Sequence, residues 1–286
     1  MRVLLIGADG LVGRHLRTTL QDVSLTCTTR RGDDGARPLD ITDAERARTI
    51  VREGRPEVVI LAAAEPFVER CEREPEATRR VNVDAARTFA AECEALHALF
   101  VVFSSEYVFD GSKGDYVEDD ARHPINEYGR QKVALEDIAL GLRRGLVCRT
   151  SAVFGEDSKR KNFVLQLVDR LRRGEPFDVP ADQHVTPTYA PSLAGAVRDL
   201  LCAGGTGIFH VAGPRVLDRM AFARMVAETY GLDASLLRPR PTAELGLVAP
   251  RPARCGLRTD KVRALIGRPL ADPQEALHEM AAARPA

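Results

Sequence analysis

The chain has 286 residues, and its content of 44% hydrophobic and 29% charged residues is typical of a globular protein with a substantial core. Its 41 Lys and Arg residues balance 41 Asp and Glu residues, which argues against a surface for nucleic acid or an anionic membrane. No apolar run approaches the ~20 residues that a membrane-spanning helix needs.

The sequence begins with MRVLLIGADG, whose short apolar run meets glycine at once. A signal peptide needs a longer apolar core, so we expect a cytoplasmic protein with a buried first strand at residues 2–6. The six cysteines form no CxxC pair and have no histidine at ligand spacing. This favours reduced thiols over a metal or disulfide framework.

Strand and helix patterns alternate through the first half of the chain. After the first strand come helices at 11–20, 42–52, 75–96 and 126–142, which alternate with strands at 24–29, 57–64, 99–105 and 146–150. Thr42 and Glu45 form a capping box at the start of the second helix. Apolar strands alternating with helices are typical of a parallel sheet covered on both faces. The pattern therefore predicts an α/β fold with a doubly wound parallel sheet, a Rossmann fold.

The second half of the chain is less regular. It shows helix patterns at 162–173, 191–202 and 218–230, a short strand at 207–212, a loop rich in Pro and Arg at 238–254, and a last helix from Asp272. Asp218 is the expected N-cap of the third of these helices. We expect a first domain over 1–155, with returning segments near 186–213, and a smaller C-terminal region over 156–286.

A glycine motif, GxxGxxG, joins the first strand to the first helix. Gly7 allows the tight turn, Gly10 lets a pyrophosphate approach the backbone, and Gly13 lets the helix pack close to the strand. The helix N-terminus offers N–H groups and partial positive charge to the phosphates. A tight turn alone would also use glycines, but the strand before the motif and the helix after it favour a dinucleotide site. The predicted contacts are Gly7, Asp9, Gly10, Leu11, Val12 and Gly13.

The end of the second strand separates NAD from NADP. An acidic residue there would hold the ribose 2′-hydroxyl of NAD, whereas this chain has Arg30 and Arg31. Two guanidinium groups can clamp a phosphate, so we expect NADPH. NADH is the alternative, if both arginines are solvated loop residues. Asp40 and Ile41 either meet the adenine edge or form a turn before the next helix. The domain over 1–155 is thus predicted to bind NADP.

Two further groups of small residues fall at strand ends, where ligands bind in an open α/β sheet. Ala62, Ala63 and Ala64 follow one strand and would let a cofactor lie against the backbone. Ser104 and Ser105 end the strand at 99–105. Both groups are predicted to border the cofactor.

Tyr128 and Lys132 lie one turn apart on the next helix. Considered alone, they are an ordinary surface pair. With the glycine loop and Ser105 in register they suit reduction of a ketone, because the alkoxide left by hydride transfer needs a proton. A tyrosine of pKa ~10 can provide that proton if a nearby cation lowers its pKa. Ser105 would hold the carbonyl oxygen, or else cap a helix or turn.

The motifs GxxGxxG, SSEYVFDG at 104–111 and YGRQK at 128–132 resemble the extended short-chain dehydrogenase/reductase superfamily, and within it the dTDP-4-dehydrorhamnose reductase family. The likeness continues at 74–85, 149–155, 162–163, 186–188 and 251–261, so it covers most of the chain. It implies that Ser105, Tyr128 and Lys132 are catalytic, that Lys132 also reaches the nicotinamide ribose, and that no metal is needed.

The resemblance also implies a nucleotide-sugar substrate. The candidate contacts are Glu106, Tyr107, Ala152, Asn162, Phe163, Thr186 and Arg251. Arg251 is either the partner of the diphosphate or a solvated loop charge. Phe109 is expected in the core, and Phe163 in either place. Ala152 stands where the family often has an aromatic residue, and Glu65-Pro66 replaces a usual polar pair, so we expect a different sugar site.

The sequence thus predicts NADPH-dependent reduction of the keto group of a nucleotide-linked 4-keto-6-deoxysugar. One alternative is a nucleotide-sugar epimerase or dehydratase with bound NAD. Another is a non-catalytic NADP-binding regulatory subunit, because the Ala-Ala-Glu run and the proline–arginine loop also resemble the regulatory β subunit of methionine adenosyltransferase. No nucleic-acid or membrane partner is expected, and a homodimer is left open.

Overall fold

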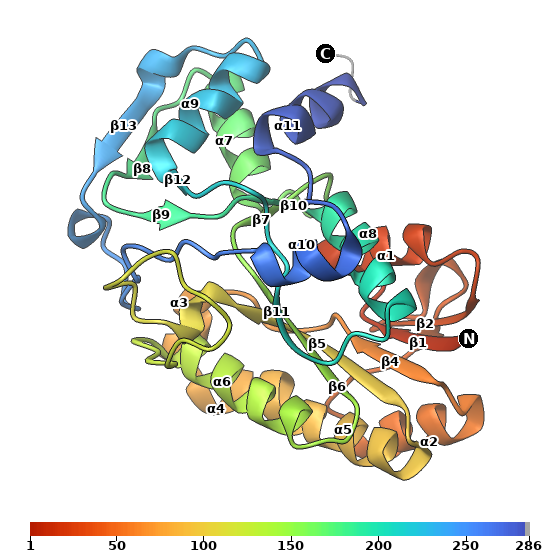
Figure 1. Ribbon diagram of the computed structural model, residues 1–286. Helices are drawn as coiled ribbons and strands as arrows, with labels where there is room; N and C mark the ends of the chain where they lie inside the picture. The colour runs from red at the N-terminus through yellow and green to blue at the C-terminus, as the bar shows by residue number, and fades with distance from the viewer. Residues whose placement is uncertain (284–286) are drawn as a thin grey trace.

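A seven-stranded parallel sheet lies at the centre of the computed structural model, which describes residues 1–283 (Figure 1). The strand order is β11-β6-β5-β4-β1-β2-β3, so the chain starts inside the sheet and winds outward in both directions. This confirms the doubly wound α/β fold. The strands are β1 (Arg2–Ile6), β2 (Ser24–Thr29), β3 (Arg37–Pro38), β4 (Val58–Leu61), β5 (Leu99–Ser105), β6 (Gly145–Thr150) and β11 (Gly207–His210).

Helices cover both faces of this sheet. Val3 and Leu5 of β1 pack into one layer, and Leu4 and Ile6 into the other, because successive side chains of a strand point to opposite faces. The first layer contains α1 (Leu11–Thr19), α8 (Ala190–Cys202) and α10 (Asp260–Ile266); the second contains α2 (Ala44–Gly54), α5 (Ala85–Leu96) and α6 (Glu127–Leu140). The chain therefore returns to the sheet twice after residue 155, through α8 with β11 and through α10.

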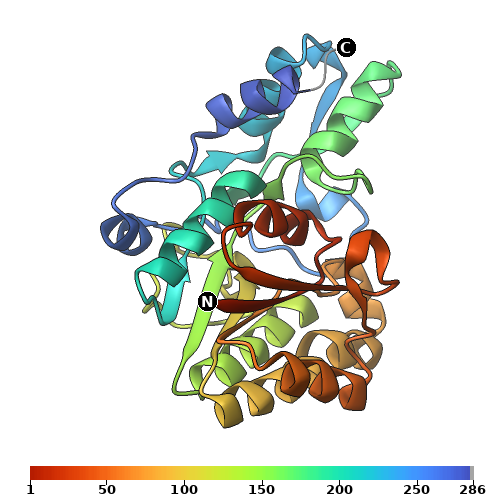
Figure 2. The same cartoon turned by 90° about the vertical axis from the view of Figure 1, so that its right-hand side faces the viewer.

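A smaller lobe, built from the second half of the chain, lies above the layered sheet in Figures 1 and 2. It has its own core, around Phe154, Val168, Phe222 and Leu277. Its helices are α7 (Phe163–Arg172), α9 (Arg219–Thr229) and α11 (Pro273–Ala282), and its paired strands are β7 (Val153–Phe154) with β10 (Thr188–Tyr189), β8 (Phe177–Pro180) with β13 (Leu237–Arg240), and β9 (His184–Val185) with β12 (Leu217–Asp218).

The helix expected at 75–96 is interrupted by a π turn. It consists of α4 (Pro75–Arg79), the π turn η2 (Arg80–Asp84) and then α5, and the short helix α3 (Val68–Arg73) precedes it. Such turns often occur at functional sites. The remaining short turns are η1 (Asp33–Gly35), η3 (Glu106–Val108), η4 (Ala234–Leu236) and η5 (Thr242–Glu244).

Two local predictions are wrong. Asp43, and not Thr42, caps α2: its carboxylate accepts the backbone N–H of Arg46 at 3.0 Å, while the Thr42 hydroxyl donates to Asp40 at 2.7 Å. The stretch at 238–254 is not all loop, because the chain up to Arg240 pairs with β8 as an edge strand. Proline is tolerated at such an edge, so the Pro-rich composition was misleading.

Among residues 1–283, no helix combines the length and the apolar character of a membrane span. Over the same residues, no group of His, Cys, Asp and Glu side chains is placed to hold a metal ion.

Candidate active site

The glycine loop joins β1 to α1. Gly7 has a φ of 85°, in the left-handed region, and a Cβ there would lie 2.7 Å from the backbone nitrogen of Ala63. A Cβ on Gly13 would lie 2.0 Å from the carbonyl oxygen of Gly7. At Gly10 the nearest atom to such a Cβ is 3.4 Å away. Packing therefore requires glycine at positions 7 and 13, while the backbone at Gly10 is open to a ligand.

The N-terminus of α1 suits an anion. The helix has no side-chain cap at Gly10 and no acidic residue in its first turn, so its positive end is uncompensated. Leu11 and Val12 are half-buried, and the Asp9 carboxylate pairs with Lys159 at 3.1 Å. These residues fit the pyrophosphate of a dinucleotide.

The residues predicted to choose between NADP and NAD lie together after β2. Arg30 and Arg31 are exposed, and Arg30 Nη2 donates to Asp40 Oδ2 at 3.1 Å. Hydrogen bonds from Thr42 hold the pKa of Asp40 below its ordinary value. Ile41 packs against the sheet core. The small residues after β4 are half-buried at Ala62 and Ala63 and exposed at Ala64.

The three predicted catalytic side chains meet where β5 ends. Tyr128 and Lys132 lie on the first two turns of α6, which packs against β5. The Ser105 hydroxyl lies close enough to the phenol of Tyr128 to influence its pKa. Lys132 Nζ lies 5.5 Å from the centroid of the Tyr128 ring and donates to the carbonyl oxygen of Phe103 at 2.8 Å. The fold thus brings a hydroxyl, a phenol and an ammonium into one cluster.

Gly129, beside Tyr128, determines how closely α6 approaches this cluster. A Cβ on Gly129 would lie 2.2 Å from the carbonyl oxygen of Tyr107, in the turn η3 that follows Ser105. Real Cβ atoms essentially never come this close to a backbone atom. The sequence showed Gly129 only as one letter of YGRQK, and its role depends on a packing contact that no local pattern reveals.

Burial dominates the titration of the pair on α6. It raises the pKa of the Tyr128 phenol, the charge of Glu106 adds to this, and the nearby Ser105 side chain opposes it. Burial lowers the pKa of Lys132 to about 8, against the opposing charges of Cys71 and Glu136. The lowered tyrosine pKa expected from the lysine is therefore absent, since desolvation outweighs the nearby cation.

Glu106 is a buried carboxyl group in direct contact with Ser105. It is 5% exposed, and Ser105 Oγ donates to its Oε2 at 2.8 Å. Burial raises its pKa, and hydrogen bonds from Ser105 and Ser151 oppose this. A serine hydroxyl has one proton, so Ser105 cannot donate to this carboxylate and to a second acceptor at once. A protonated Glu106 would donate to Ser105 and free the serine proton.

Two arginines lie near Tyr107, which follows Glu106. Arg251 Cζ is 6.0 Å from the Tyr107 ring centroid, and its Nη2 donates to Glu69 at 2.9 Å. Arg219, at the start of α9, lies 5.1 Å from the Phe163 ring. Burial raises the pKa of Tyr107 to about 12, and the charge of Arg219 opposes this rise. Arg251 Nη1 and Arg219 Nε are buried and have no hydrogen-bond partner within residues 1–283. Both guanidinium groups can therefore still receive an acceptor.

Other predicted contacts use their polar groups internally. Asn162 caps α7, accepting the N–H of Leu165 at 3.2 Å and donating to Gly155 at 2.9 Å. Thr186 is 0% exposed and accepts the N–H of Leu257 at 2.9 Å. The Ser104 hydroxyl donates to Glu136 at 2.6 Å, away from the predicted cofactor. Each of these polar side chains therefore has at least one partner within the chain.

Three apolar residues were also considered as candidates for substrate contact or for the core. Two of them pack in a core, and the third has an unusual backbone conformation. Phe163 stacks on Phe222 at 5.8 Å in the core of the small lobe. Ala152 has a φ of 41°, so its backbone adopts a turn that few residues with a side chain favour. Phe109 is fully buried, as predicted.

Sequence reasoning missed Arg219 and also Asn82, which lies in the π turn. The Asn82 side chain accepts the N–H of Glu65 at 2.8 Å and donates to Gln131 of α6 at 2.8 Å. It therefore ties the loop after β4 to the helix that carries Tyr128. No spacing in the sequence signals either residue, because their partners come from distant segments.

Comparisons with known proteins place the chain among nucleotide-sugar reductases and their relatives. The family model described as RmlD substrate binding domain matches residues 1–284. The dTDP-4-dehydrorhamnose reductase of Mycolicibacterium smegmatis is 34% identical over 296 residues, which cover 99% of this chain and 85% of that protein.

Two further similar proteins are a reductase with a bound cofactor and a protein from another functional class. A crystal structure of dTDP-4-dehydrorhamnose reductase from Bacillus anthracis, in complex with NADP, is similar with a TM-score of 0.91 and 27% identity, covering 99% of each chain. The methionine adenosyltransferase 2 subunit beta of Rattus norvegicus is 29% identical over 275 residues, which cover 92% of this chain and 82% of that protein.

Proposed function

Because this chain belongs to the RmlD substrate binding domain family, we propose that it is an NADPH-dependent reductase of a nucleotide-linked 4-keto-6-deoxysugar. The observation that carries the proposal is the meeting of Ser105, Tyr128 and Lys132 at the end of β5. The glycine loop lies at the carboxyl end of β1 in the same parallel sheet. Ligands of such sheets bind at these strand ends.

The chemistry follows from what each side chain can donate. A bound NADPH would supply the hydride, with its pyrophosphate held at the glycine loop. Ser105 donates a hydrogen bond to the carbonyl oxygen and orients it. Tyr128 gives its proton to that oxygen as negative charge develops there. The raised pKa of the phenol suits this role, because the group keeps its proton until a strong base forms beside it.

Lys132 assists Tyr128 in its role as the acid. Its ammonium stabilises the phenolate that Tyr128 becomes after transfer. Because burial lowers the pKa of Lys132 to about 8, the ammonium is lost as pH rises through that value. Activity should therefore decline on the alkaline side.

The cofactor and substrate assignments rest on the arginines. Arg30 and Arg31 are exposed after β2, where they can pair with a 2′-phosphate. Within residues 1–283, one buried nitrogen of Arg251, near Tyr107, has no hydrogen-bond partner, which suits the diphosphate of a nucleotide sugar. Six free cysteines agree with the reducing cytoplasm.

The test is a screen of NADPH oxidation against dTDP-, GDP- and CDP-linked 4-keto sugars, with the Tyr128→Phe variant alongside. Loss of the proton donor should lower kcat by about 100-fold or more. NADPH binding, followed by its fluorescence, should change little. A Tyr128→Phe variant that keeps most of its activity would contradict the acid assignment.

The similarity to the methionine adenosyltransferase 2 subunit beta supports a second candidate, a regulatory subunit that binds NADP. Such a protein would oxidise no NADPH with any keto sugar in the panel. It would bind a larger enzyme tightly enough to co-purify with it. The screen therefore separates the two functions directly.

A further inference from the structure

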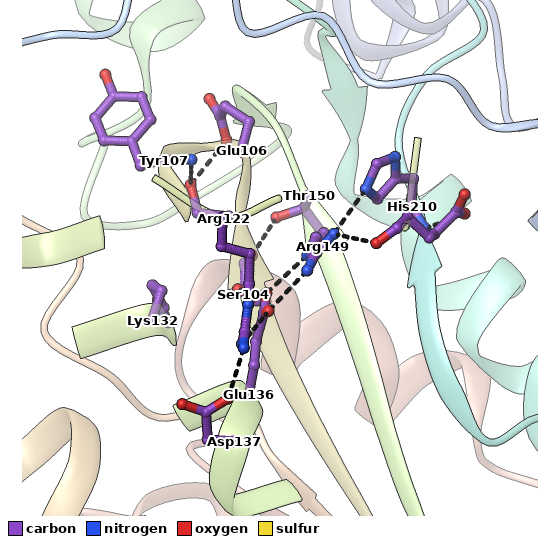
Figure 3. A network of polar contacts seen from close by, with 12 residues as sticks. Ser104, Glu106, Tyr107, Arg122, Lys132, Glu136, Asp137, Arg149, Thr150 and His210 are labelled. Carbon is purple, nitrogen blue, oxygen red and sulfur yellow. Dashed lines mark hydrogen bonds and ion pairs between the residues drawn. The ribbon is translucent and has the colours of Figure 1, made fainter. Parts of the chain in front are cut away.

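A buried ion pair joins α6 to β6 (Figure 3). Glu136 lies two turns after Tyr128, and its side chain is 0% exposed. Its carboxylate accepts from Arg149 Nε and Nη2, each at 2.8 Å, from Ser104 Oγ at 2.6 Å, and from Arg122 Nη1 at 3.2 Å. Arg149 belongs to β6 and its side chain is 1% exposed. The pair is therefore bidentate and fully enclosed, the geometry that fixes orientation most strongly.

The outer partners of Arg149 hold it in one orientation. Its Nη1 donates to the carbonyl oxygen of Glu118 at 3.0 Å and lies 3.3 Å from Nε2 of His210. His210 Nδ1 lies 3.1 Å from the carbonyl oxygen of Arg258, which can only accept, so Nδ1 carries the proton. Nε2 then accepts from Arg149. Burial, with the charge of Arg149, lowers the pKa of His210 to about 3, which keeps this histidine neutral.

Three successive turns of α6 contact three successive residues of β5. Tyr128 meets the Ser105 hydroxyl, Lys132 donates to the carbonyl of Phe103, and Glu136 accepts from Ser104. The Glu136 contact is also tied to a third element, β6, through the buried side chain of Arg149. The first two contacts involve groups that must exchange partners during the reaction. The third is the one that can hold the helix in place throughout.

We propose that Glu136 and Arg149 are positioning residues whose ion pair holds α6 in the register that brings Tyr128 to Ser105. The kinetic test of this inference rests on the proposed function. A second test, by hydrogen exchange, depends only on the structure of α6. Neither residue touches the reacting atoms. Their effect reaches the chemistry through the helix, where a misplacement of ~1 Å can lower a rate by about 100-fold.

The first experiment compares Glu136→Gln with Asp137→Asn. Glu136→Gln should lower kcat by about 100-fold, while the KM for the keto sugar and the Kd for NADPH stay within about 2-fold. Asp137 is the matched control, because it is the next residue of α6 and its side chain is 58% exposed. It shares Arg122 with Glu136, at 2.8 Å and 3.2 Å respectively, and Asp137→Asn leaves the Arg122 contact to Glu136 in place. An exposed pair contributes little, so Asp137→Asn should match the wild type. Equal kinetics of the two variants would overturn the proposal.

The pH dependence of kcat provides a second measurement, because a mere loss of stability would not shift the pH at which kcat declines. The charge of Glu136 raises the pKa of Lys132 against burial. Glu136→Gln should therefore shift the alkaline decline of kcat to lower pH. The other titratable groups that face Lys132 are Cys71 of α3 and Tyr128 of α6, and neither is altered. An unshifted decline counts against the proposal.

A double variant separates positioning from stability. Replacing a buried ion pair by apolar residues of similar volume is often neutral or stabilising, so Glu136→Leu with Arg149→Met should fold. Positioning predicts a stable protein whose kcat stays low, because the directed contacts to Ser104 are lost. A kcat restored together with thermal stability overturns the proposal. If this variant fails to fold, Ser104→Ala decides instead, with a kcat lowered by about 10-fold expected and an unchanged kcat overturning it.

Hydrogen exchange distinguishes this proposal from the proposed function. In Glu136→Gln the amides of the first two turns of α6 should exchange about 10-fold faster, while those of α5 and those of Asp137→Asn keep the wild-type rate. If the wild-type protein reduces no keto sugar, the proposed function fails and this measurement alone decides the positioning role. Unchanged exchange in α6 would then overturn it.

Discussion

The two sides of the candidate site are held in different ways. On the sheet side, Tyr128 is positioned by backbone contact at Gly129 and by the ion pair at Glu136. On the side of the small lobe, Arg219 and Arg251 each keep a buried nitrogen that has no partner within residues 1–283. The side chains on the sheet side are thus held in place without a ligand, whereas the two arginines on the lobe side still have room for a hydrogen-bond acceptor. Changes on the first should act on kcat, and changes on the second on KM.

The largest effect is expected from Gly129→Ala. A Cβ at this position would lie 2.2 Å from the carbonyl oxygen of Tyr107, so the first turn of α6 must move. Because Tyr128 moves with it, kcat should fall by about 100-fold, with NADPH binding retained. Steady-state kinetics and NADPH fluorescence measure the two effects.

Gly54→Ala is the control for this substitution. Gly54 is the last residue of α2, and a Cβ there meets nothing nearer than 3.9 Å. Its kinetics should equal those of the wild type. If Gly129→Ala also behaves like the wild type, the sheet side is less tightly fixed than the contact implies.

The lobe side is tested by Arg251→Met and Arg219→Met. Each removes one charged donor to the proposed diphosphate, an interaction of ~1.5–3 kcal/mol. The KM for the nucleotide sugar should rise by about 10-fold or more, with kcat changed much less, because the contact is present before and during the reaction. Inhibition by the free nucleoside diphosphate should weaken in parallel.

Arg224→Met is the matched control, because Arg224 is exposed on α9, the helix that begins with Arg219. It should leave the KM unchanged. If Arg219→Met and Arg224→Met give the same KM, Arg219 has no part in substrate binding. If Arg219→Met or Arg251→Met lowers kcat without raising KM, the lobe side acts on the rate and not on substrate binding, contrary to the expectation.

The same comparison explains what the sequence could predict. The glycines at positions 7 and 13, the four-residue spacing of Tyr128 and Lys132, and the buried strands are local patterns. Their physical causes act within one strand–helix unit, so a short stretch of sequence carries them. The fold and the sheet side of the site follow from such units.

The lobe side could not be predicted in this way. Arg219 reaches Phe163 and the surroundings of Tyr107 only because the chain returns from the small lobe. Asn162 and Thr186 were expected to contact substrate, which stays a prediction, and the structure adds that they cap α7 and hold the backbone of Leu257. Whether a polar residue faces a ligand depends on which internal partners the fold provides, and these come from distant segments.

A smaller effect is expected at the cofactor end of the sheet. Arg30→Asp replaces an exposed guanidinium that pairs with Asp40, and it places two acidic groups where a 2′-phosphate is proposed to bind. The Kd for NADPH should rise by about 10-fold, and that for NADH should change little. Arg87→Asp, an exposed residue of α5, controls for the change in net charge. An unchanged preference between the cofactors would refute the role of Arg30.

The smallest change in rate is expected at Glu106, where the informative quantity is the pH dependence. Glu106 faces Ser105, Ser151, Tyr107, Tyr128, Arg219 and Cys255. Burial raises its pKa, so it is protonated at a higher pH than an ordinary glutamate. While it is protonated it can donate to Ser105 and leave the serine proton for the carbonyl. As pH rises through this pKa, the carboxylate accepts the hydrogen bond of Ser105, which then has no proton left to donate to the carbonyl. Activity should therefore fall over that range.

Glu106→Gln keeps a donor to Ser105 at every pH and has no charge. It should keep kcat within about 3-fold of the wild type at low pH and lose the decline due to Glu106. The later decline due to Lys132, whose pKa is about 8, should remain. Glu106→Ala lacks the donor and should be slower than Glu106→Gln at every pH. Identical pH profiles of the wild type and Glu106→Gln would mean that the carboxyl group does not control the Ser105 proton. The arrangement of Ser105 and Tyr128 on the sheet side would then depend on packing and not on the charge of Glu106.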